Sequence, residues 1–386
     1  MTAEDANTPF TGAPLNDTLR RLNDAGTAVW LDDLSRERLD SGELARQVRE
    51  GLIAGVTTNP TIFHQAITHS SAYDSQLAGL ARLGTTAADA LRLLTCADVR
   101  RAADILRPVH DASGGIDGMV SIEVAPGLAH DTAGTLAEAR LLHWLVDRPN
   151  VLIKIPATDA GLPVVAHCLA EGIGVNVTLI FGLARYRQVT QAHLDGLERA
   201  AQAGLDVSRI ASVASFFVSR VDAAVDARLD KRDTAQARAL RGRAAIVNAR
   251  LAYELHEQVR SGPRWQALAA LGAQPQRPLW ASTGVKDPAY DDTRYVVELA
   301  APDTVNTMPA ATLSAVIDHG EPRGDTVRGR YEQARGTLEE LGAVGIDLDT
   351  ITEELETDGV ARFQDSWQQL TAGISAALGA EGNPDA

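Results

Sequence analysis

Short apolar runs alternate with amphipathic stretches along most of this 386-residue chain. An apolar run of about four to eight residues bounded by Gly, Pro, Asn or Asp predicts a strand, whereas apolar residues that recur every three or four positions predict a helix. Eight segments have the strand pattern: residues 28–33, 55–60, 117–124, 150–156, 174–180, 209–217, 277–283 and 303–308. The segments between them have the helical pattern, for example the helix predicted from Ser35 to Gly51.

Strands that alternate with helices indicate a parallel sheet covered by helices. Eight is the number of strands that closes a (β/α)8 barrel, and we predict that fold for one domain spanning residues 1–386. An open doubly wound sheet is the alternative, but the GxGxxG and GxxxxGKS/T nucleotide-binding motifs are absent. Residues 1–15 are predicted to form a loose arm. The chain is predicted to be helical from Pro309 nearly to its end, so that residues from about 325 to 386 form a helical extension packed on the barrel.

Polar residues follow the parity of the predicted strands. Successive side chains of a strand point to opposite faces, so Leu152 and Lys154 share one face of the fourth strand. The matching positions of the other strands form the predicted inward set: Trp30, Asp32, Thr57, Asn59, Met119, Ser121, Glu123, Asn176, Thr178, Ser215, Phe217, Trp280 and Ser282. Its polar members lie toward the carboxyl ends of the strands, where barrels of this kind have their active sites. The pattern therefore predicts a site at that end.

An inward lysine is the most informative member of this set, because an ammonium ion is costly to bury. One interpretation is a lysine that extends to solvent or pairs with an acid. The other is an amine removed from water so that it can attack a carbonyl near neutral pH. Imine chemistry also requires groups that move protons, and two carboxylates, Asp32 and Glu123, have the same inward parity as Lys154. The surroundings therefore favour a nucleophilic amine.

Composition excludes several other functions. A formal net charge of −15 argues against a nucleic-acid partner, which requires a basic face. We expect no secretory signal, because the first ten residues lack its pattern, and no membrane span, because no apolar stretch approaches about twenty residues. Two cysteines suit a reducing cytoplasm. The nine histidines form no HExxH or similar motif, and no serine lies in a GxSxG elbow, so neither a metal site nor serine hydrolysis is expected.

Four segments resemble the signatures of a known family. They are residues 55–61 (GVTTNPT), 151–158 (VLIKIPAT), 174–181 (GVNVTLIF) and 215–220 (SFFVSR). The chain is similar, from about residue 28 to about residue 375, to transaldolases, the Schiff-base-forming class I aldolases of the pentose phosphate pathway. The resemblance implies an enzyme that needs no cofactor and that acts on ketose and aldose phosphates. It leaves open whether the chain is a monomer or a homodimer.

By this resemblance, Lys154 forms the Schiff base and Asp32 takes the proton from the C4 hydroxyl of the donor as the C3–C4 bond breaks. Glu123 serves imine formation with a water held by Thr178. The resemblance assigns substrate binding to the remaining residues: Asn59, Asn176 and Ser215 for hydroxyls of the dihydroxyacetone unit, Arg220 for the phosphate, and also Phe217 and Ser282. Many members have a second phosphate-binding arginine shortly after the serine of the seventh strand. Here Lys286 is expected to replace it as a point charge, and a solvated loop lysine is the alternative.

The function implied is transfer of a dihydroxyacetone unit from sedoheptulose 7-phosphate to glyceraldehyde 3-phosphate, which gives erythrose 4-phosphate and fructose 6-phosphate. A lyase similar to fructose-6-phosphate aldolase is the first alternative. Those shorter enzymes have a tyrosine where this chain has Phe217, and they lack its C-terminal extension, so both features favour transfer. A non-catalytic sugar-phosphate-binding barrel is the second alternative, and the presence of Lys154, Asp32 and Glu123 argues against it.

Overall fold

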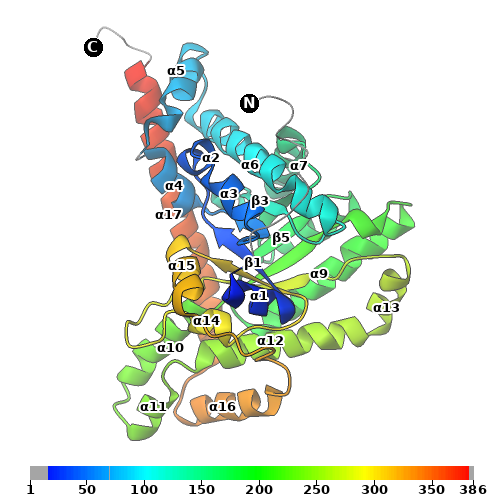
Figure 1. Cartoon of the computed structure of the whole chain (residues 1–386), viewed down its shortest axis with the longest axis vertical. Helices are drawn as coiled ribbons and strands as arrows, with labels where there is room; N and C mark the ends of the chain where they lie inside the picture. Colours follow the sequence, from blue (N-terminus) through cyan, green and yellow to red (C-terminus); the bar gives the residue numbers. More distant parts are fainter. Residues whose placement is uncertain (1–15, 69, 382–386) are drawn as a thin grey trace.

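The computed structural model describes residues 16–68 and 70–381, and within them eight parallel strands form a closed barrel (Figure 1). Each strand pairs with the next along the chain, and the last pairs with the first. The strands are β1 Thr27–Asp32, β2 Gly55–Thr57, β3 Met119–Glu123, β4 Val151–Pro156, β5 Val175–Ile180, β6 Ser212–Phe217, β7 Arg277–Ala281 and β8 Thr304–Met308. The predicted (β/α)8 barrel is confirmed, and each of the eight predicted strands is present in part or in full.

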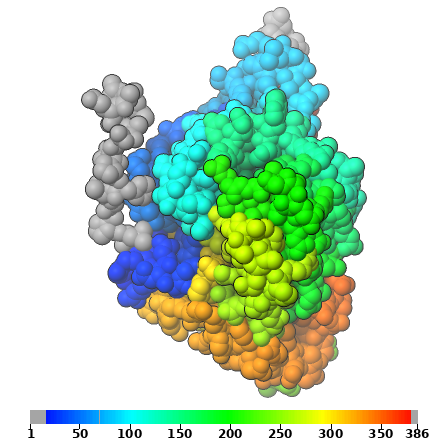
Figure 2. Space-filling view, turned by 90° about the vertical axis from the view of Figure 1, so that its right-hand side faces the viewer, coloured from blue at the N-terminus to red at the C-terminus, as the bar shows by residue number. Residues whose placement is uncertain are grey.

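Helices follow the strands and cover the outside of the barrel. They are α1 Asp17–Asp24, α2 Arg36–Asp40, α3 Glu43–Arg49, α4 Pro60–Thr68, α5 Asp74–Arg82, α6 Ala87–Ala112, α7 Thr132–Val146, α8 Gly161–Ala170, α9 Leu183–Gln202, α10 Ser219–Asp230, α11 Ala235–Leu240, α12 Ala244–Ser261, α13 Pro263–Ala270, α14 Arg294–Val297, α15 Ala310–His319, α16 Tyr331–Ala343 and α17 Leu348–Glu381. Short 3-10 turns lie at Ser71–Tyr73, Pro126–Leu128 and Val207–Arg209. Figure 2 shows one helical face, with the light-blue segment around α5 standing out at the top.

Two predicted helices are wrong in detail. The helix predicted from Ser35 to Gly51 is divided into α2 and α3, because Gly42 between them has a left-handed backbone conformation with φ of 75°. The helical stretch predicted after Pro309 is interrupted at residues 320–330, where three glycines and a proline separate α15 from α16. The predicted N-terminal arm, residues 1–15, lies outside the described residues.

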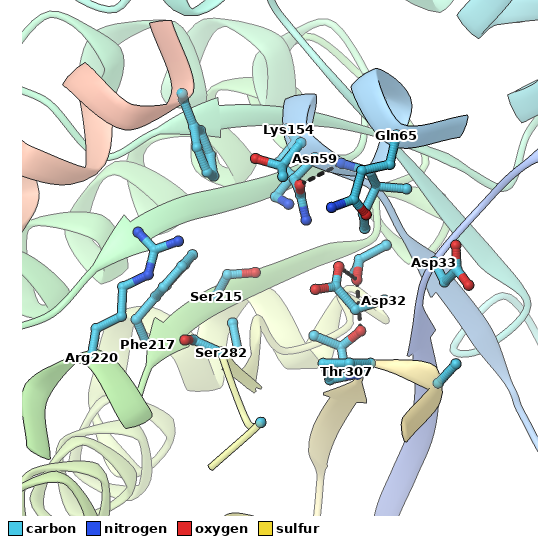
Figure 3. A pocket seen from close by; sticks show the side chains of 18 of the residues that line it. Asp32, Asp33, Asn59, Gln65, Lys154, Ser215, Phe217, Arg220, Ser282 and Thr307 are labelled. Atoms are coloured by element: carbon cyan, nitrogen blue, oxygen red, sulfur yellow. Dashed lines mark hydrogen bonds between the residues drawn. The ribbon is translucent and has the colours of Figure 1, made fainter. Parts of the chain in front are cut away.

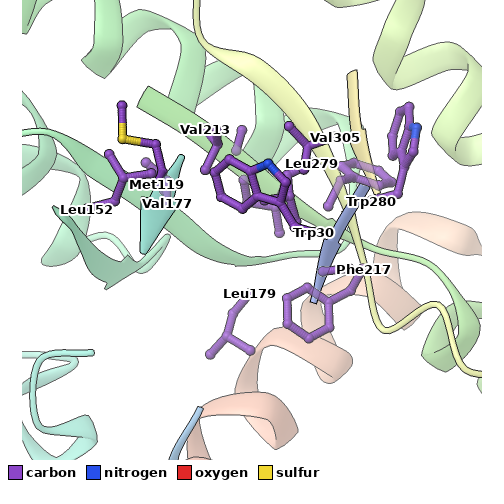
Figure 4. Packing of buried hydrophobic residues seen from close by; sticks show 14 of the residues in the cluster. Trp30, Met119, Leu152, Val177, Leu179, Val213, Phe217, Leu279, Trp280 and Val305 are labelled. Carbon is purple, nitrogen blue, oxygen red and sulfur yellow. The ribbon is translucent and has the colours of Figure 1, made fainter. Parts of the chain in front are cut away.

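Trp30 fills the lower part of the barrel and leaves the carboxyl end for polar groups. It is fully buried among Val213, Leu279 and Val305 (Figure 4). A Cβ atom at residue 55 would lie 2.5 Å from the indole ring, so the strand beside Trp30 requires a glycine there. Below the indole, Arg277 pairs with Asp117 at 2.8 Å and closes the amino end. The barrel is therefore a packed core with one open end.

The predicted parity of the seventh strand is wrong. Trp280 was expected to point inward, but its Nε1 donates to the carbonyl of Leu299 at 2.9 Å, and its ring packs edge-on against Phe216, outside the barrel. The inward residue of β7 is Leu279 (Figure 4). Ser282 nevertheless reaches the barrel mouth, because its φ of 56°, just past the end of the strand, redirects its side chain.

The long helix α17 lies over the carboxyl end of the barrel. It contacts α4, α5, α6 and α10, and in Figure 1 it runs as a red rod from beside α5 toward α10. Its Gln364 donates to the carbonyl of Pro126 at 3.2 Å, and its Glu356 pairs with Arg185 at 2.9 Å. No helix within the described residues is long and apolar enough to cross a membrane.

Candidate active site

Two adjoining cavities lie at the carboxyl ends of the strands. The larger has a volume of about 480 Å³ (Figure 3). Of the predicted site residues, it is lined by Asp32, Asn59, Lys154, Ser215, Phe217, Arg220, Ser282 and Lys286. The smaller, of about 10 Å³, is lined in part by Glu123 and Thr178, and Lys154 lines both cavities. The smaller cavity is close to the minimum volume for one water molecule.

Lys154 lies in the middle of β4 with its side chain buried against an acid. Its Nζ is 3.0 Å from Oε1 of Glu123 and donates to the carbonyl of Thr58 at 2.6 Å. The hydroxyl of Thr58 donates to the other carboxylate oxygen of Glu123 at 2.9 Å. With the lysine only 5% exposed, extension to solvent is excluded. Passing a proton from Nζ to Glu123 would leave two neutral groups in place of a buried ion pair, so the amine can be freed without leaving an unpaired charge.

Asp32 stands at the end of β1 on the far side of the larger cavity. The hydroxyl of Thr57 donates to its carboxylate at 2.7 Å, and a second hydroxyl, that of Thr307, lies 2.6 Å from Thr57 (Figure 3). Burial raises the pKa of Asp32, and the positive charge of Lys154 and the bond from Thr57 oppose the rise in part. A carboxylate with a raised pKa holds a proton more firmly, which suits a group that removes and returns one.

Thr178 and Glu123 face each other across the smaller cavity, next to Lys154. The hydroxyl of Thr178 is buried and has no hydrogen-bond partner in the described part of the chain. Oε1 of Glu123 likewise accepts no hydrogen bond there, although it lies in the ion pair with Lys154. Because buried hydroxyls are almost always hydrogen-bonded, this geometry favours a water between the two side chains.

The predicted hydroxyl-binding residues are at two different depths. Asn176 is fully buried beneath the cavity, where its amide nitrogen donates to Ser121 at 2.9 Å and its carbonyl oxygen accepts from Ser215 at 2.7 Å. Ser215 itself lines the cavity, so Asn176 orients its hydroxyl. Asn59 also lines the cavity, and its carbonyl oxygen accepts from the backbone of Ile62 at 3.0 Å in the first turn of α4.

Arg220, in the first turn of α10, brings a half-buried positive charge to the cavity wall. Its guanidinium lies 5.3 Å from the ring centroid of Phe217 (Figure 3). Among the described residues it forms no ion pair or hydrogen bond. Burial lowers its pKa, and the nearby charge of Arg362 on α17 lowers it further. A desolvated guanidinium with an open cavity in front of it is suited to an anion.

The loop after β7 brings two further predicted residues to the same cavity. The hydroxyl of Ser282 is 2.9 Å from that of Ser219, which links the loop after β7 to the start of α10. Lys286 lines the cavity from an exposed position on the same loop. Its role as a phosphate ligand, with a solvated loop lysine as the alternative, stays a prediction.

Among the lining residues of the larger cavity that were not predicted as site residues are four with polar or aromatic side chains: Asp33, Gln65, Thr307 and Phe363. The alternation of β8 could have indicated Thr307, because it has the parity of the inward Val305. Gln65 lies one helical turn after Thr61 on α4 and points toward Asn59 (Figure 3). Phe363 comes from α17 and lines both cavities. Its sequence neighbourhood gives no sign of this position.

Metal binding was not expected from the sequence. Within residues 16–68 and 70–381, no three His, Cys, Asp or Glu side chains are grouped so that they could hold a metal ion.

Comparison with known proteins gives a consistent result. The sequence model of the family described as Transaldolase/Fructose-6-phosphate aldolase matches residues 29–374. Transaldolase 1 of Streptomyces coelicolor is 59% identical over 364 residues, which cover 94% of this chain and 96% of that protein. The transaldolase of Frankia alni is 57% identical and covers 95% and 99%. That of Acidothermus cellulolyticus is 58% identical and covers 94% and 98%. The resemblance found from the four sequence segments is thus confirmed over nearly the whole chain.

Proposed function

Because the chain belongs to the transaldolase/fructose-6-phosphate aldolase family, we propose that it is a transferase that moves a dihydroxyacetone unit through a Schiff base on Lys154. The donor is sedoheptulose 7-phosphate and the acceptor is glyceraldehyde 3-phosphate; erythrose 4-phosphate and fructose 6-phosphate are the products. One observation carries the assignment: a buried lysine paired with a carboxylate at 3.0 Å opens into a cavity that also contains a second carboxylate and a guanidinium without an ion-pair partner among the described residues.

The first stage forms the imine. Nζ of Lys154, after giving a proton to Glu123, attacks the C2 carbonyl of the ketose. The carbinolamine then loses water, for which a proton must reach the departing hydroxyl. Glu123 supplies that proton, directly or through a water held against Thr178 in the smaller cavity. The protonated imine withdraws electrons from C3, which prepares the adjacent bond for cleavage.

The second stage breaks and remakes a carbon–carbon bond. Asp32 removes the proton from the C4 hydroxyl, the C3–C4 bond breaks, and the aldose leaves while the electron pair moves into the enamine. The acceptor aldehyde then binds, the enamine carbon attacks it, and Asp32 returns a proton to the new hydroxyl. Arg220 holds the phosphate of each aldose in turn, which keeps the reacting carbon close to Asp32.

Transfer is favoured over lysis because the enamine is shielded from water. Water could protonate and hydrolyse the intermediate, which would release free dihydroxyacetone. The aromatic ring of Phe217 lies against the cavity without a hydroxyl that could position water, and its partner ring, Phe181, packs 5.0 Å away. Phe363 adds a second apolar ring from α17. Both rings favour a longer-lived intermediate.

Three further properties belong to this proposal. The barrel, α16 and α17 form a single domain, because α17 completes the wall of the cavity. Two free, buried cysteines, Cys96 and Cys168, suit the cytoplasm. The oligomeric state, a monomer or a homodimer, stays a prediction.

The test combines trapping with product analysis. Borohydride reduction in the presence of fructose 6-phosphate should add the reduced dihydroxyacetone unit to the peptide that contains residues 151–158. With erythrose 4-phosphate present, the enzyme should form sedoheptulose 7-phosphate much faster than free dihydroxyacetone. An adduct on another lysine would overturn the residue assignment. Free dihydroxyacetone as the main product would instead identify a lyase.

A further inference from the structure

The phosphate end of the cavity is built from two segments that are far apart in sequence. Arg220 lies in the first turn of α10, whereas Ser282 and Lys286 lie on the loop that follows β7. At the cavity, the backbone N–H of Ser219 donates to the carbonyl of Ser282 at 3.1 Å, and the two serine hydroxyls are 2.9 Å apart. The relative position of Arg220 and Lys286 therefore depends on how firmly α10 is attached to this loop.

Behind the cavity, Asp222 makes that attachment. It lies two residues after Arg220 on α10 and is 2% exposed. One of its carboxylate oxygens accepts from the hydroxyl of Tyr295, in α14 directly after the loop, at 2.7 Å. The other accepts from the backbone N–H of Ala245, at the start of α12, at 2.8 Å. Hydrogen bonds to a charged, buried acceptor are stronger than those between neutral groups, so this one side chain joins three elements firmly.

A second attachment lies one helical turn further along α10. Asp226 accepts from the hydroxyl of Tyr290 at 2.6 Å and from the backbone N–H of Gly242 at 2.9 Å. The guanidinium of Arg294 covers both tyrosine rings, with centroid distances of 4.4 Å for Tyr290 and 5.2 Å for Tyr295, and it donates to the carbonyl of Gly242. Both acids thus have each carboxylate oxygen bonded. Tyr290 lies on the loop that carries Lys286, and Tyr295 lies in α14, which follows that loop directly.

We propose that Asp222 and Tyr295 are positioning residues that fix Arg220 relative to Ser282 and Lys286, and so set the affinity for the phosphate of the aldose. The inference rests on the proposed function, in which Arg220 binds that phosphate. Neither Asp222 nor Tyr295 lines the cavity, so they act through the two segments that they join. Bidentate binding by a guanidinium requires its position to be held within about 0.5 Å, whereas the reaction centre at Lys154 does not depend on this attachment.

The decisive variant is Tyr295→Phe, which removes one hydroxyl and keeps the ring under Arg294. The KM for glyceraldehyde 3-phosphate should rise about tenfold, while kcat/KM for unphosphorylated glyceraldehyde should change by less than about twofold. Tyr73→Phe is the matched control. Its hydroxyl also donates to a buried aspartate, Asp98 on α6, at 2.8 Å, and accepts from the backbone N–H of Arg36 on α2, so its hydrogen bonds join α2 and α6 rather than α10 and the loop after β7. The control should lower the melting temperature without changing the ratio of the two acceptors.

Further variants distinguish a failure of this inference from a failure of the phosphate assignment of Arg220. If Tyr295→Phe slows both acceptors equally, its role is structural and the inference is wrong. Arg220→Ala tests the underlying assignment by itself, because an unchanged phosphate preference in that variant would refute the phosphate site. In the Arg220→Ala background, Tyr295→Phe should have no further effect on the phosphate preference. Should Tyr295→Phe not fold, Tyr290→Phe decides, with a smaller rise in the same KM expected and an unchanged acceptor ratio refuting the inference.

Discussion

Replacing Arg220 with alanine tests how the cavity recognises phosphate. In the described structure this guanidinium has no anionic partner. The charge of Arg362 disfavours its positive charge, and that of Asp32 favours it. Its partial burial has already removed part of its hydration before any ligand arrives. A phosphate that enters the cavity can therefore bind the side of the Arg220 guanidinium that faces the cavity.

The expected loss follows from the bonds that this cation can form. Two parallel N–H···O bonds to a phosphate contribute about 1.5 kcal/mol each at the low end of the range for charged partners. The low end applies because the mouth is open to solvent. The sum of about 3 kcal/mol corresponds to about a 100-fold loss of kcat/KM, at about 1.4 kcal/mol for each factor of ten. Since Arg220 forms no ion pair or hydrogen bond with the described residues and only lies over the ring of Phe217, its removal should change the free energy of unfolding by less than about 1 kcal/mol.

The assay compares two acceptors in the same variant. With glyceraldehyde 3-phosphate, kcat/KM should fall about 100-fold, and with glyceraldehyde it should fall less than about threefold. Inorganic phosphate should raise the melting temperature of the parent and not that of the variant. Arg228→Ala is the matched control, because Arg228 lies on the same helix but pairs with Glu354 outside the cavity. Lys286→Ala should give a loss of the same kind but smaller, because an ammonium binds as a point charge.

Two outcomes would refute this reasoning. Equal losses for both acceptors would mean that Arg220 supports the reaction centre rather than the phosphate. Phosphate stabilisation that persists in Arg220→Ala would mean that another group binds the anion. If Lys286→Ala alone leaves the phosphate preference unchanged, Lys286 is a solvated loop lysine and only its own assignment fails.

The remaining predictions concern the reaction centre. Lys154→Met should bind sugar phosphate but form no borohydride-trapped adduct, and an adduct of normal mass on this variant would contradict the Schiff-base assignment. Phe217→Tyr should release free dihydroxyacetone from fructose 6-phosphate faster than the parent while transfer declines, because a hydroxyl there can position water; an unchanged ratio would direct attention to Phe363. Asp32→Asn should lose activity. Its free energy of unfolding relative to that of the parent should increase as pH rises. Burial raises the pKa of Asp32 above its ordinary value of 3.8, so the folded parent binds the proton more tightly and loses stability as pH rises from that value through the raised pKa. Urea unfolding across this pH range should show that the difference in free energy of unfolding between variant and parent grows and then becomes constant. A difference that does not change with pH would contradict the raised pKa. Exhaustive EDTA treatment should leave activity unchanged, and a loss restored by one divalent ion would show that a metal takes part.

The local pattern of the sequence was enough for the barrel and for the centre of its site. A strand has a two-residue period, so the parity of Lys154 on β4 and of Glu123 on β3 follows from the chain alone. Parallel neighbours in register then place these two residues side by side, as the pairing of Glu123 with Lys154 shows. The carboxyl ends of all eight strands meet at one end of a barrel, which brings Asp32 to the larger cavity that Lys154 also lines.

The same reasoning fails where a strand ends or where a helix returns from far along the chain. Trp280 faces outward because Leu279 takes the inward position of β7. Ser282 turns into the cavity because of its own φ of 56°, which alternation along a strand cannot predict. No local pattern shows that Arg220 forms no ion pair or hydrogen bond with the described residues, and Phe363 reaches the cavity only because α17 crosses the mouth. Periodicity acts over a few residues and fixes which face a side chain takes. Which distant segments close over that face is decided by tertiary packing, because only burial against those segments determines where they lie.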